Sequence, residues 1–517
     1  MSATTAGGGG LELGTAVASH RGEVDEAPSG FRQLAGGVVG LPEVDDDGKP
    51  MRTGTVWTAS AHIITAIIGS GVLSLAWGIA QLGWIAGPAT LLLFSSITYY
   101  TSRLLSDCYR HHSTGKRNYT YMEAVNAYLG RRMEWACGIV QCVMLCGATI
   151  GYAITASISM VAIRKSDCLH KRGHAASCKF STNLYLVGMG VAEVVVSQIP
   201  NFHKLAWLSV LAAIMSFLYA SIGLGLAVAR VASGVICAGK GETSSSLTGV
   251  EANGMDKIWR MCTAIGDMAF ACSYSAILIE IQDTLRSTPA ENKVMKKASG
   301  VAVSVSTVFY LLCGCFGYAA FGNRAPGNML SASGFYEPFW LIDLANVCIV
   351  IHLVGAFQVT AQPVFMRFEA WASNKWPDSE FVTKEYRIRL PAAIFGGKSA
   401  PAGFTVNPLR LVGRTALVTA ATVVAMAVPF FNDVLALLGA VSYWPLTVYF
   451  PVEMHIAQSK LIRRSSGGGG RRRPPANWIG LQLLNLVCLV VAIAAACGAI
   501  RGLSHSLLAY KPFMFEQ

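Results

Sequence analysis

The sequence predicts an all-α integral membrane protein with about eleven transmembrane helices. Of the 517 residues, 53% are hydrophobic and only 14% are charged, whereas a soluble protein carries about 25% charged residues. The apolar residues also come in long runs of about 20, the length a helix needs to cross roughly 30 Å of hydrocarbon. In lipid every backbone polar group must be bonded within the segment, so helices are the structure that such runs adopt.

The expected spans follow from reading these runs along the chain. The first is the least apolar, and the eighth is long enough to tilt or to continue into the cytosol. The spans are expected near 55–79, 83–106, 134–163, 183–200, 204–229, 258–284, 298–322, 338–369, 408–430, 432–455 and 478–500. They form one transmembrane domain over residues 51–517.

A polar tail over residues 1–50 precedes the spans. It holds Gly7–Gly10, eight acidic residues and three basic ones, which is the composition of a disordered segment. Because it has no apolar core flanked by positive charge, we expect no secretory signal peptide. The tail is therefore predicted to be cytosolic.

The positive charges indicate an orientation. With the N-terminus inside, 29 of the 41 Lys and Arg residues fall on the inner side and 12 on the outer side. This split follows the rule that cytosolic loops are enriched in Lys and Arg, although the outer loop 164–179 is itself basic. We expect a cytosolic N-terminus and an extracellular C-terminus. The sequon at Asn118 then lies inside and carries no sugar.

Two cysteines, Cys168 and Cys178, lie in the outer loop 164–179. Disulfides persist in the extracellular compartment, so this pair is predicted to be joined. His170 and His174 lie nearby and leave a metal site as the alternative, which we regard as less favoured. No metal site is expected elsewhere.

A glycine–serine–glycine triplet lies almost halfway along span 55–79. Gly69 and Gly71 flank Ser70 there, and this composition favours unwinding near the bilayer midplane. The N–H groups of Ser70, Gly71 and Val72 would then face a cavity and attract a carboxylate. The alternative is that the small residues only allow close helix packing.

A second interruption is expected in span 258–284. Its centre is small or polar, and Asp267 and Glu280 flank it. A carboxylate within a span costs at least ~2.5 kcal/mol, so it usually faces a cavity and has a function. The two interrupted spans stand five apart, which suggests two inverted five-helix repeats, one extra helix, and a substrate site between the breaks. The two halves share no clear sequence identity.

Three further titratable residues lie within spans. Glu193 is either a proton acceptor or a hydrogen-bonded structural carboxyl, and the sequence does not decide between them. His62 and His352 could carry protons near neutral pH, although a lone helix histidine more often has a packing role. The chain has no P-loop, so we expect a gradient and not ATP as the energy source.

Five sequence blocks resemble the plant amino acid permeases of the amino acid and auxin permease group. They are GTVWTASAHIITAIIGSGVLSLAWGIAQLGW (54–84), SQIPNFHKLAWLSVLAAIMSF (197–217), AFACSYSAILIEIQDTL (269–285), ENKVMKKAS (291–299) and AYKPF (509–513). The resemblance implies a proton-coupled symporter that imports amino acids across the plasma membrane by alternating access. It also implies a LeuT-like core with eleven spans, no enzymatic activity, and no cofactor other than protons as the coupling ion.

The resemblance also assigns roles to particular residues. The backbone around the first break binds the substrate carboxylate, and the second break surrounds the amino group and side chain. The implied substrate-binding residues are Gly69, Ser70, Gly71, Val72, Phe270, Ser273 and Tyr274. Asp267 and Glu193 are the main proton-coupling candidates, with Glu280 and His62 as further ones. Cys272 stands where the family more often has Tyr, and the family also accepts Asn in place of Asp267.

Other functions remain open at this level. An amino acid sensor could use the same fold without turnover, and an auxin carrier belongs to the same group. Uptake of labelled amino acid would separate a transporter from a sensor. A channel would need a continuous polar stripe or a ring of like charges, and a membrane enzyme would need a nucleophile–base pair or a metal set. The sequence shows neither.

Overall fold

The computed structural model describes most of the chain. The described residues are 45–49, 51–173, 177–198, 206–233, 245–331, 335, 337–388, 404–465 and 477–510. The chain divides into two compact units, Met1–Met51 and Arg52–Gln517. All but the last few residues of the predicted tail lie outside the described part, and so do His174, residues 199–205 of the block 197–217 and residues 511–513 of the block 509–513.

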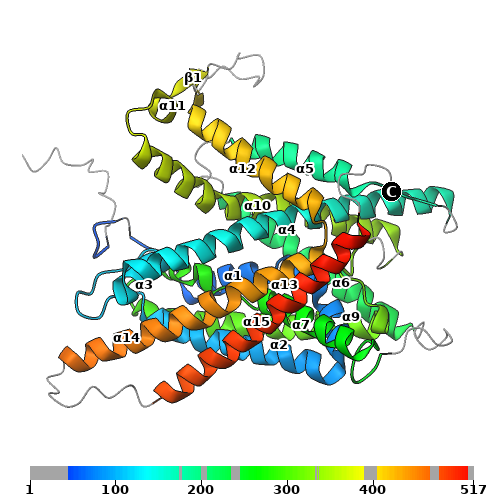
Figure 1. Ribbon diagram of the computed structural model, residues 1–517, viewed down its shortest axis with the longest axis horizontal. Helices are drawn as coiled ribbons and strands as arrows, with labels where there is room; N and C mark the ends of the chain where they lie inside the picture. Colours follow the sequence, from blue (N-terminus) through cyan, green and yellow to red (C-terminus); the bar gives the residue numbers. More distant parts are fainter. Residues whose placement is uncertain are drawn as a thin grey trace, which may run out of the picture. The chain divides into compact units, whose positions relative to one another are not determined.

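Long helices make up the second unit (Figure 1). Nine stretches of the described residues are long and apolar enough to cross a membrane, by length and composition alone. The helices that contribute to them are α2 (Leu75–Asp107), α4 (Arg131–Arg172), α6 (Ala206–Ala232), α7 (Gly254–Ala271), α8 (Leu278–Gln282), α9 (Glu291–Phe321), α10 (Phe339–Lys375), α12 (Pro408–Ala427), α13 (Phe431–Ser442), α14 (Phe450–Ser465) and α15 (Trp478–Ala509). Two shorter apolar helices, α1 (Val56–Ile67) and α5 (Thr182–Ser197), occupy the first and fourth predicted spans.

The first and second predicted spans meet inside α2. The helix is interrupted at Gly83, whose φ of 86° lies in the region that favours glycine. A Cβ at this position would lie 2.3 Å from the carbonyl oxygen of Leu247, so the neighbouring backbone also excludes a side chain. The first predicted span, 55–79, therefore ends within α2 before this interruption, and the second, 83–106, begins at it.

The tenth predicted span is also composite. A π-helical segment, η8 (Tyr443–Tyr449), joins α13 to α14 and contains Pro445. Proline lacks the N–H that would continue the α-helical hydrogen bonds, which explains a local change of helix type at this point.

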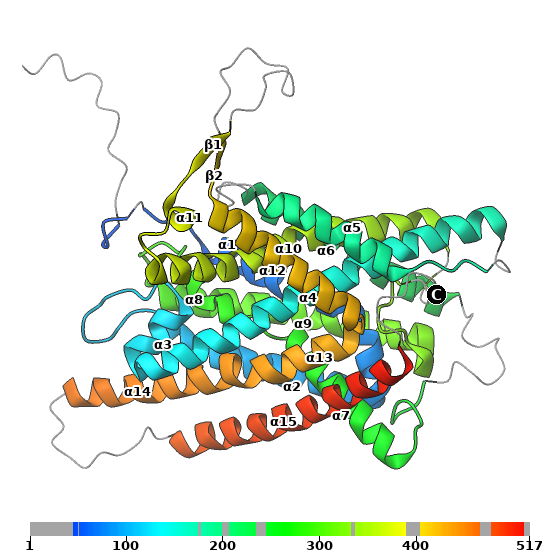
Figure 2. The same cartoon turned by 45° about the horizontal axis from the view of Figure 1, so that its top comes forward.

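Many of the helix pairings involve α2, α7 and α9. The most extensive pairings join α4 to α10, α2 to α9, and α7 to α13. The last helix, α15, lies along α7 and α13, as both views show (Figures 1 and 2). Its opposite face exposes large apolar side chains such as Ile479, Leu483 and Leu486, which suits contact with lipid.

Three expectations about the connections are wrong. The helix α4 continues to Arg172, so Cys168 lies in a helix and not in a loop. A short helix, α3 (Tyr121–Leu129), lies in the predicted loop after the second span. After α10 the chain forms α11 (Glu380–Thr383) and two antiparallel strands of three residues each, β1 (Tyr386–Ile388) and β2 (Phe404–Val406), in a connection where no such elements were predicted; the transmembrane fold itself is helical. These polar segments lack the apolar runs on which the prediction depended.

Candidate functional site

The first break lies where the glycine–serine–glycine triplet predicts it. The helix α1 begins after Thr55, whose side chain accepts a hydrogen bond from the N–H of Thr58, and it ends at Ile67. Ile68 and Gly69 are not helical, and the 3-10 helix η2 (Ser70–Ser74) follows. The break and η2 together separate α1 from α2.

Two N–H groups at this break have no backbone acceptor among the residues that the structure describes. Those of Ser70 and Gly71 precede the first hydrogen bond of η2, and neither donates to a backbone carbonyl in the described part of the chain. The N–H of Val72 donates to the carbonyl of Gly69 at 3.3 Å. Two of the three predicted carboxylate donors therefore have no backbone acceptor among the described residues, and the third, Val72, already donates to Gly69. All three residues are buried.

The second break interrupts the sixth predicted span. The helix α7 ends at Ala271, residues 272–274 are not helical, and the 3-10 helix η5 (Ser275–Ile277) leads into α8. The hydroxyl of Ser273 lies 3.2 Å from that of Thr447 in the π-helical segment η8. The second break therefore faces the irregular part of the tenth span.

The two breaks touch each other. A Cβ on Gly71 would lie 3.0 Å from the Cβ of Ala271 and 3.2 Å from its Cα. Glycine at position 71 therefore permits the close approach, as the packing interpretation of the triplet requires. The same contact brings the unpaired N–H groups of Ser70 and Gly71 next to the end of α7. Close packing and a binding site are thus compatible at this position.

A small cavity opens beside the contact between the breaks. Its lining residues come from α1, α2, α9 and the second break, and most of them are polar. They are Ile67, Ser95, Cys272, Val303, Ser306, Thr307 and Tyr310. The volume is about 10 Å³, which fits one water molecule. An amino acid does not fit in this cavity unless the helices move apart.

The remaining residues of the second break point in different directions. Cys272 lines the cavity, and its Sγ lies 3.8 Å from the hydroxyl of Ser95. Phe270 packs against the cluster of apolar residues between α4 and α13. The hydroxyl of Tyr274 lies between α2 and α9, beside Ser102 and Ser299. Tyr274 therefore does not border this small cavity.

Asp267 lies one helical turn before the second break and is fully buried. Neither of its carboxyl oxygens has a hydrogen-bond partner among the described residues. The hydroxyl of Ser74 lies beside this carboxyl and donates to the carbonyl of Gly71 at 2.9 Å. Asp267 is thus connected through Ser74 to the first break.

Glu193 lies on α5 and is also fully buried. One of its oxygens accepts a hydrogen bond of 2.6 Å from Gln358 on α10, and the other oxygen has no partner in the described part of the chain. Its hydrogen bonds tie α5 to α10, and none joins it to a residue of either break.

Glu280 lies on α8, beyond the second break. One of its oxygens accepts a hydrogen bond of 3.1 Å from the N–H of Tyr121, the first residue of α3. A carboxylate at a helix N-terminus satisfies a free N–H and is favoured by the helix dipole. Glu280 therefore has a structural role at the start of α3.

The two histidines differ in position. His352 on α10 is buried, and its Nδ1 lies 2.8 Å from the carbonyl oxygen of Ala212. Because a carbonyl oxygen only accepts, Nδ1 carries the hydrogen, and Nε2 lies 3.9 Å from the position of a Cβ on Gly69. His62 is exposed on α1. Only His352 lies at the first break.

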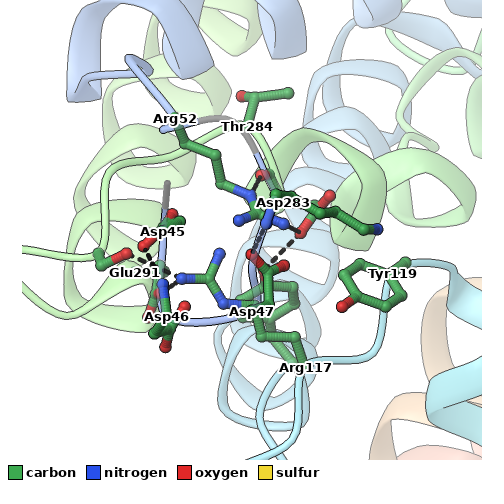
Figure 3. A network of polar contacts seen from close by, with 12 residues as sticks. Asp45, Asp46, Asp47, Arg52, Arg117, Tyr119, Asp283, Thr284 and Glu291 are labelled. Carbon is green, nitrogen blue, oxygen red and sulfur yellow. Dashed lines mark hydrogen bonds and ion pairs between the residues drawn. The ribbon is translucent and has the colours of Figure 1, made fainter. Parts of the chain in front are cut away.

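Charged side chains connect the N-terminal ends of α1 and α9 (Figure 3). Arg52 forms an ion pair of 2.9 Å with Asp283, and Tyr109 donates a hydrogen bond of 2.6 Å to the same carboxylate. Gly54 donates its N–H to the carbonyl of Thr284 at 2.9 Å. The segment before α1 is thus attached to the segment after α8.

A second ion cluster lies in the same network. Glu291, the first residue of α9, forms ion pairs of 2.5 Å with Arg110 and 3.5 Å with Arg117. Asp107 at the end of α2 pairs with Lys296 at 2.6 Å. Burial and the neighbouring Asp283 raise the pKa of the Tyr109 hydroxyl, so this donor keeps its hydrogen throughout the physiological pH range. Contacts between several chain segments therefore hold this charged network together.

Sequence reasoning missed several residues around the breaks. Tyr310 and Ser306 on α9, Tyr219 on α6 and Thr447 in η8 are buried there. The only signal that could have found them is a hydroxyl within an otherwise apolar span, which is also common in simple packing positions.

Comparison with known proteins decides the family. The family described as transmembrane amino acid transporter protein matches residues 52–502. Amino acid permease 8 of Arabidopsis thaliana is 57% identical over 479 residues, covering 92% of this chain and 97% of that protein. The chain belongs to the transmembrane amino acid transporter family. It is a transporter and not an enzyme.

Further relatives support this assignment of the transporter. Amino acid permease 1 of Arabidopsis thaliana is 56% identical over 472 residues, with 91% of this chain and 93% of that protein covered. Lysine histidine transporter-like 6 of the same plant is 28% identical over 462 residues, with 88% and 92% covered. The resemblance to the plant amino acid permeases is thereby confirmed, and the chain is an amino acid transporter of the membrane.

Proposed function

We propose that this transporter is a proton-coupled symporter that imports amino acids across the plasma membrane by alternating access. The observation that carries the proposal is the contact between the two helix breaks, where unpaired N–H groups of Ser70 and Gly71 lie beside the end of α7. Interrupted helices within a membrane are tolerated where they are buried in protein or line a cavity. In transporters such breaks hold the substrate.

The polarity of the two breaks suits an amino acid. The N–H groups of Ser70 and Gly71 are donors for the carboxylate, and they begin the helix η2. The carbonyl groups at the end of α7, including that of Ala271, are acceptors for the ammonium group. Ser273 and Thr447 border the same region and would contact the substrate side chain.

Alternating access is supported by the two ends of α1. The cavity beside the breaks accepts about one water molecule, so substrate binding requires the breaks to separate. At the other end of α1, Arg52 and Gly54 are attached to residues 283–284 after α8. For the substrate site to open toward this end of α1, the attachment of Arg52 and Gly54 to residues 283–284 must break. We propose that this end of α1 faces the cytosol.

Asp267 is the preferred proton carrier. Its carboxyl group is fully buried without a hydrogen-bond partner in the described part of the chain, and Ser74 links it to the first break. A buried charge without a partner carries a large free-energy cost, which a bound proton removes. Proton binding at Asp267 would therefore be sensitive to movements at the break. Glu193 remains a second candidate, although it lies on α5 away from the breaks.

The proposed topology has eleven spans with a cytosolic N-terminus and an extracellular C-terminus. It counts the short helices α1 and α5 with the nine longer stretches. The breaks in the first and sixth spans support two inverted repeats of a LeuT-like core and one further helix.

Uptake and current measurements test this function. In a transport-deficient cell, labelled neutral amino acid should accumulate, and inward current should increase as the outside pH falls from 7 to 5. Sodium-dependent uptake without any response to pH would contradict proton coupling. Binding without accumulation would favour a sensor, and uptake of auxin in preference to amino acids would favour an auxin carrier.

A further inference from the structure

Tyr310 lies within hydrogen-bond reach of the last carbonyl groups of both interrupted helices. Its hydroxyl donates to the carbonyl of Ile67, the last residue of α1. The same hydroxyl lies 3.3 Å from the carbonyl oxygen of Ala271, the last residue of α7. The side chain comes from α9 and is 1% exposed. One buried hydroxyl therefore joins the two helix ends.

The carbonyl groups of Ile67 and Ala271 differ in the hydrogen bonds that they already accept from the backbone. The carbonyl of Ile67 also accepts from the N–H of Gly69 at 2.9 Å. No backbone N–H in the described part of the chain donates to the carbonyl of Ala271. A tyrosine hydroxyl has one hydrogen to donate at a time. While Tyr310 bonds to Ile67, the carbonyl of Ala271 is available to another donor.

The ends of α1 and α7 repel each other. The C-terminus of a helix carries a partial negative charge of about half an elementary charge. Two such ends brought together within a membrane need a positive group or a hydrogen-bond donor between them, and bound cations have this role in several transporters. Here the hydrogen of the Tyr310 hydroxyl lies between the two ends, attached to α9 by a covalent side chain.

We propose that Tyr310 is a positioning residue for substrate binding. Its hydroxyl holds the carbonyl ends of α1 and α7 at the separation at which the free carbonyl receives the ammonium group of an amino acid. It takes the place of a bound metal cation between these ends. The inference rests on the proposed function in one respect, because it requires the two breaks to be the substrate site.

The cavity beside Tyr310 supports this role. Ser306 lies one turn before Tyr310 on α9, is 2% exposed, and has a hydroxyl without a hydrogen-bond partner in the described part of the chain. Both side chains line the cavity, together with Ile67 and Cys272 from the two breaks. Tyr310 thus lines a small cavity that residues of both breaks also line.

The test compares two tyrosines of the same helix. Tyr310→Phe removes only the hydroxyl, and Tyr318→Phe removes another buried hydroxyl of α9, which bonds to Ser246 and Asn323. We expect Tyr310→Phe to raise KM for a neutral amino acid about tenfold, which corresponds to about 1.4 kcal/mol. Surface abundance and maximal current should stay unchanged. Tyr318→Phe should keep the KM of the unsubstituted chain.

A third variant separates the hydrogen bond from packing. Genetic incorporation of 4-aminophenylalanine at position 310 restores a donor with a similar shape, and it should return KM to within about threefold of the unsubstituted value. An unchanged KM in Tyr310→Phe, or a loss of abundance with an unchanged KM, would overturn the inference. If the unsubstituted chain transports and Tyr310→Phe equals it, only the role of Tyr310 fails. If the unsubstituted chain does not transport, the proposed function itself fails.

Discussion

Gly71 and Ala271 approach so closely that a Cβ on Gly71 would lie 3.0 Å from the Cβ of Ala271. The two residues are 200 positions apart in the chain and belong to the first and sixth predicted spans. Gly69, two residues earlier, has more space: a Cβ there would have His352 Nε2 at 3.9 Å as its nearest neighbour. The triplet therefore contains one glycine that the packing requires and one that it does not.

This difference predicts unequal effects of the same substitution. Gly71→Ala should raise KM for amino acids at least tenfold, because the added methyl group pushes the first break away from the end of α7. Gly69→Ala should change KM by less than threefold, since a Cβ at this position would meet its nearest neighbour only at 3.9 Å. Uptake kinetics with surface labelling measure both. Equal KM values in the two variants, with less Gly71→Ala protein at the surface, would leave only a packing role for Gly71.

Asp267→Asn should remove the dependence of uptake on pH. The amide keeps the size of the side chain but cannot bind and release a proton, so the ratio of uptake at pH 5 to uptake at pH 7 should fall toward one. In the unsubstituted chain this ratio should exceed one, because a lower outside pH increases the inward driving force on protons. Glu193→Gln is the matched control, since Glu193 lies on α5 and bonds to Gln358. If Asp267→Asn keeps the pH 5 to pH 7 uptake ratio of the unsubstituted chain while the ratio in Glu193→Gln falls to one, Glu193 and not Asp267 is the proton carrier.

Arg52→Ala should loosen the attachment between the segments before α1 and after α8. Its ion pair with Asp283 is partly buried, and the loss of such a charged hydrogen bond costs about 2 kcal/mol. Cys108 is a natural reporter, because it is buried beside Tyr109 and Asp107. Burial and the neighbouring Asp107 raise the pKa of its thiol, which keeps it unreactive while the network is closed.

The measurement is the rate at which a membrane-permeant maleimide modifies Cys108, followed by peptide mass spectrometry. We expect this rate to increase at least tenfold in Arg52→Ala. Lys171→Ala is the control, since it removes an exposed ion pair with Asp167 on α4 and should leave the rate unchanged. An unaltered rate in both variants would mean that the Arg52 contact does not hold this end of the bundle closed.

Cys168 and Cys178 should be joined in the mature protein. The structure places them in a disulfide with their Cα atoms 6.2 Å apart. Mass spectrometry of unreduced peptides should find the linked pair, whereas two free thiols would argue against an extracellular position. A lack of N-glycosylation at Asn118 would not show on which side of the membrane this residue lies. Its side chain is buried and donates a hydrogen bond of 3.0 Å to the carbonyl of Cys108, which hinders glycosylation on either side.

Local composition made several features predictable. The triplet at 69–71 and the small polar centre of span 258–284 lie at the observed interruptions, because glycine and serine weaken a helix wherever they occur together. The length of each apolar run likewise located the long helices, since the membrane thickness sets that length. The end of α4 was misplaced because a helix that leaves the membrane needs no apolar residues.

The roles of individual side chains were harder to predict. Asp267 and Glu193 are both buried acids within spans, and only the packing of α7 against η2 places Asp267 beside the first break. Glu280 is a third acid within a predicted span, but it is only partly buried, and it accepts a hydrogen bond from the first N–H of α3. A sequence shows which residues are unusual in lipid, and it does not show which neighbours they meet.

The sequence by itself determined the membrane class, the approximate positions of most long helices and the positions of both breaks, because these depend on local hydrophobicity and local helix stability. Only the tertiary structure decided that the breaks touch through Gly71 and Ala271 and that Tyr310 reaches the ends of both helices. Tyrosine in an apolar helix is compatible with simple packing, and its hydrogen-bond partners lie far away in the chain. Such contacts depend on how whole helices rotate and cross, which the local pattern of residues does not specify.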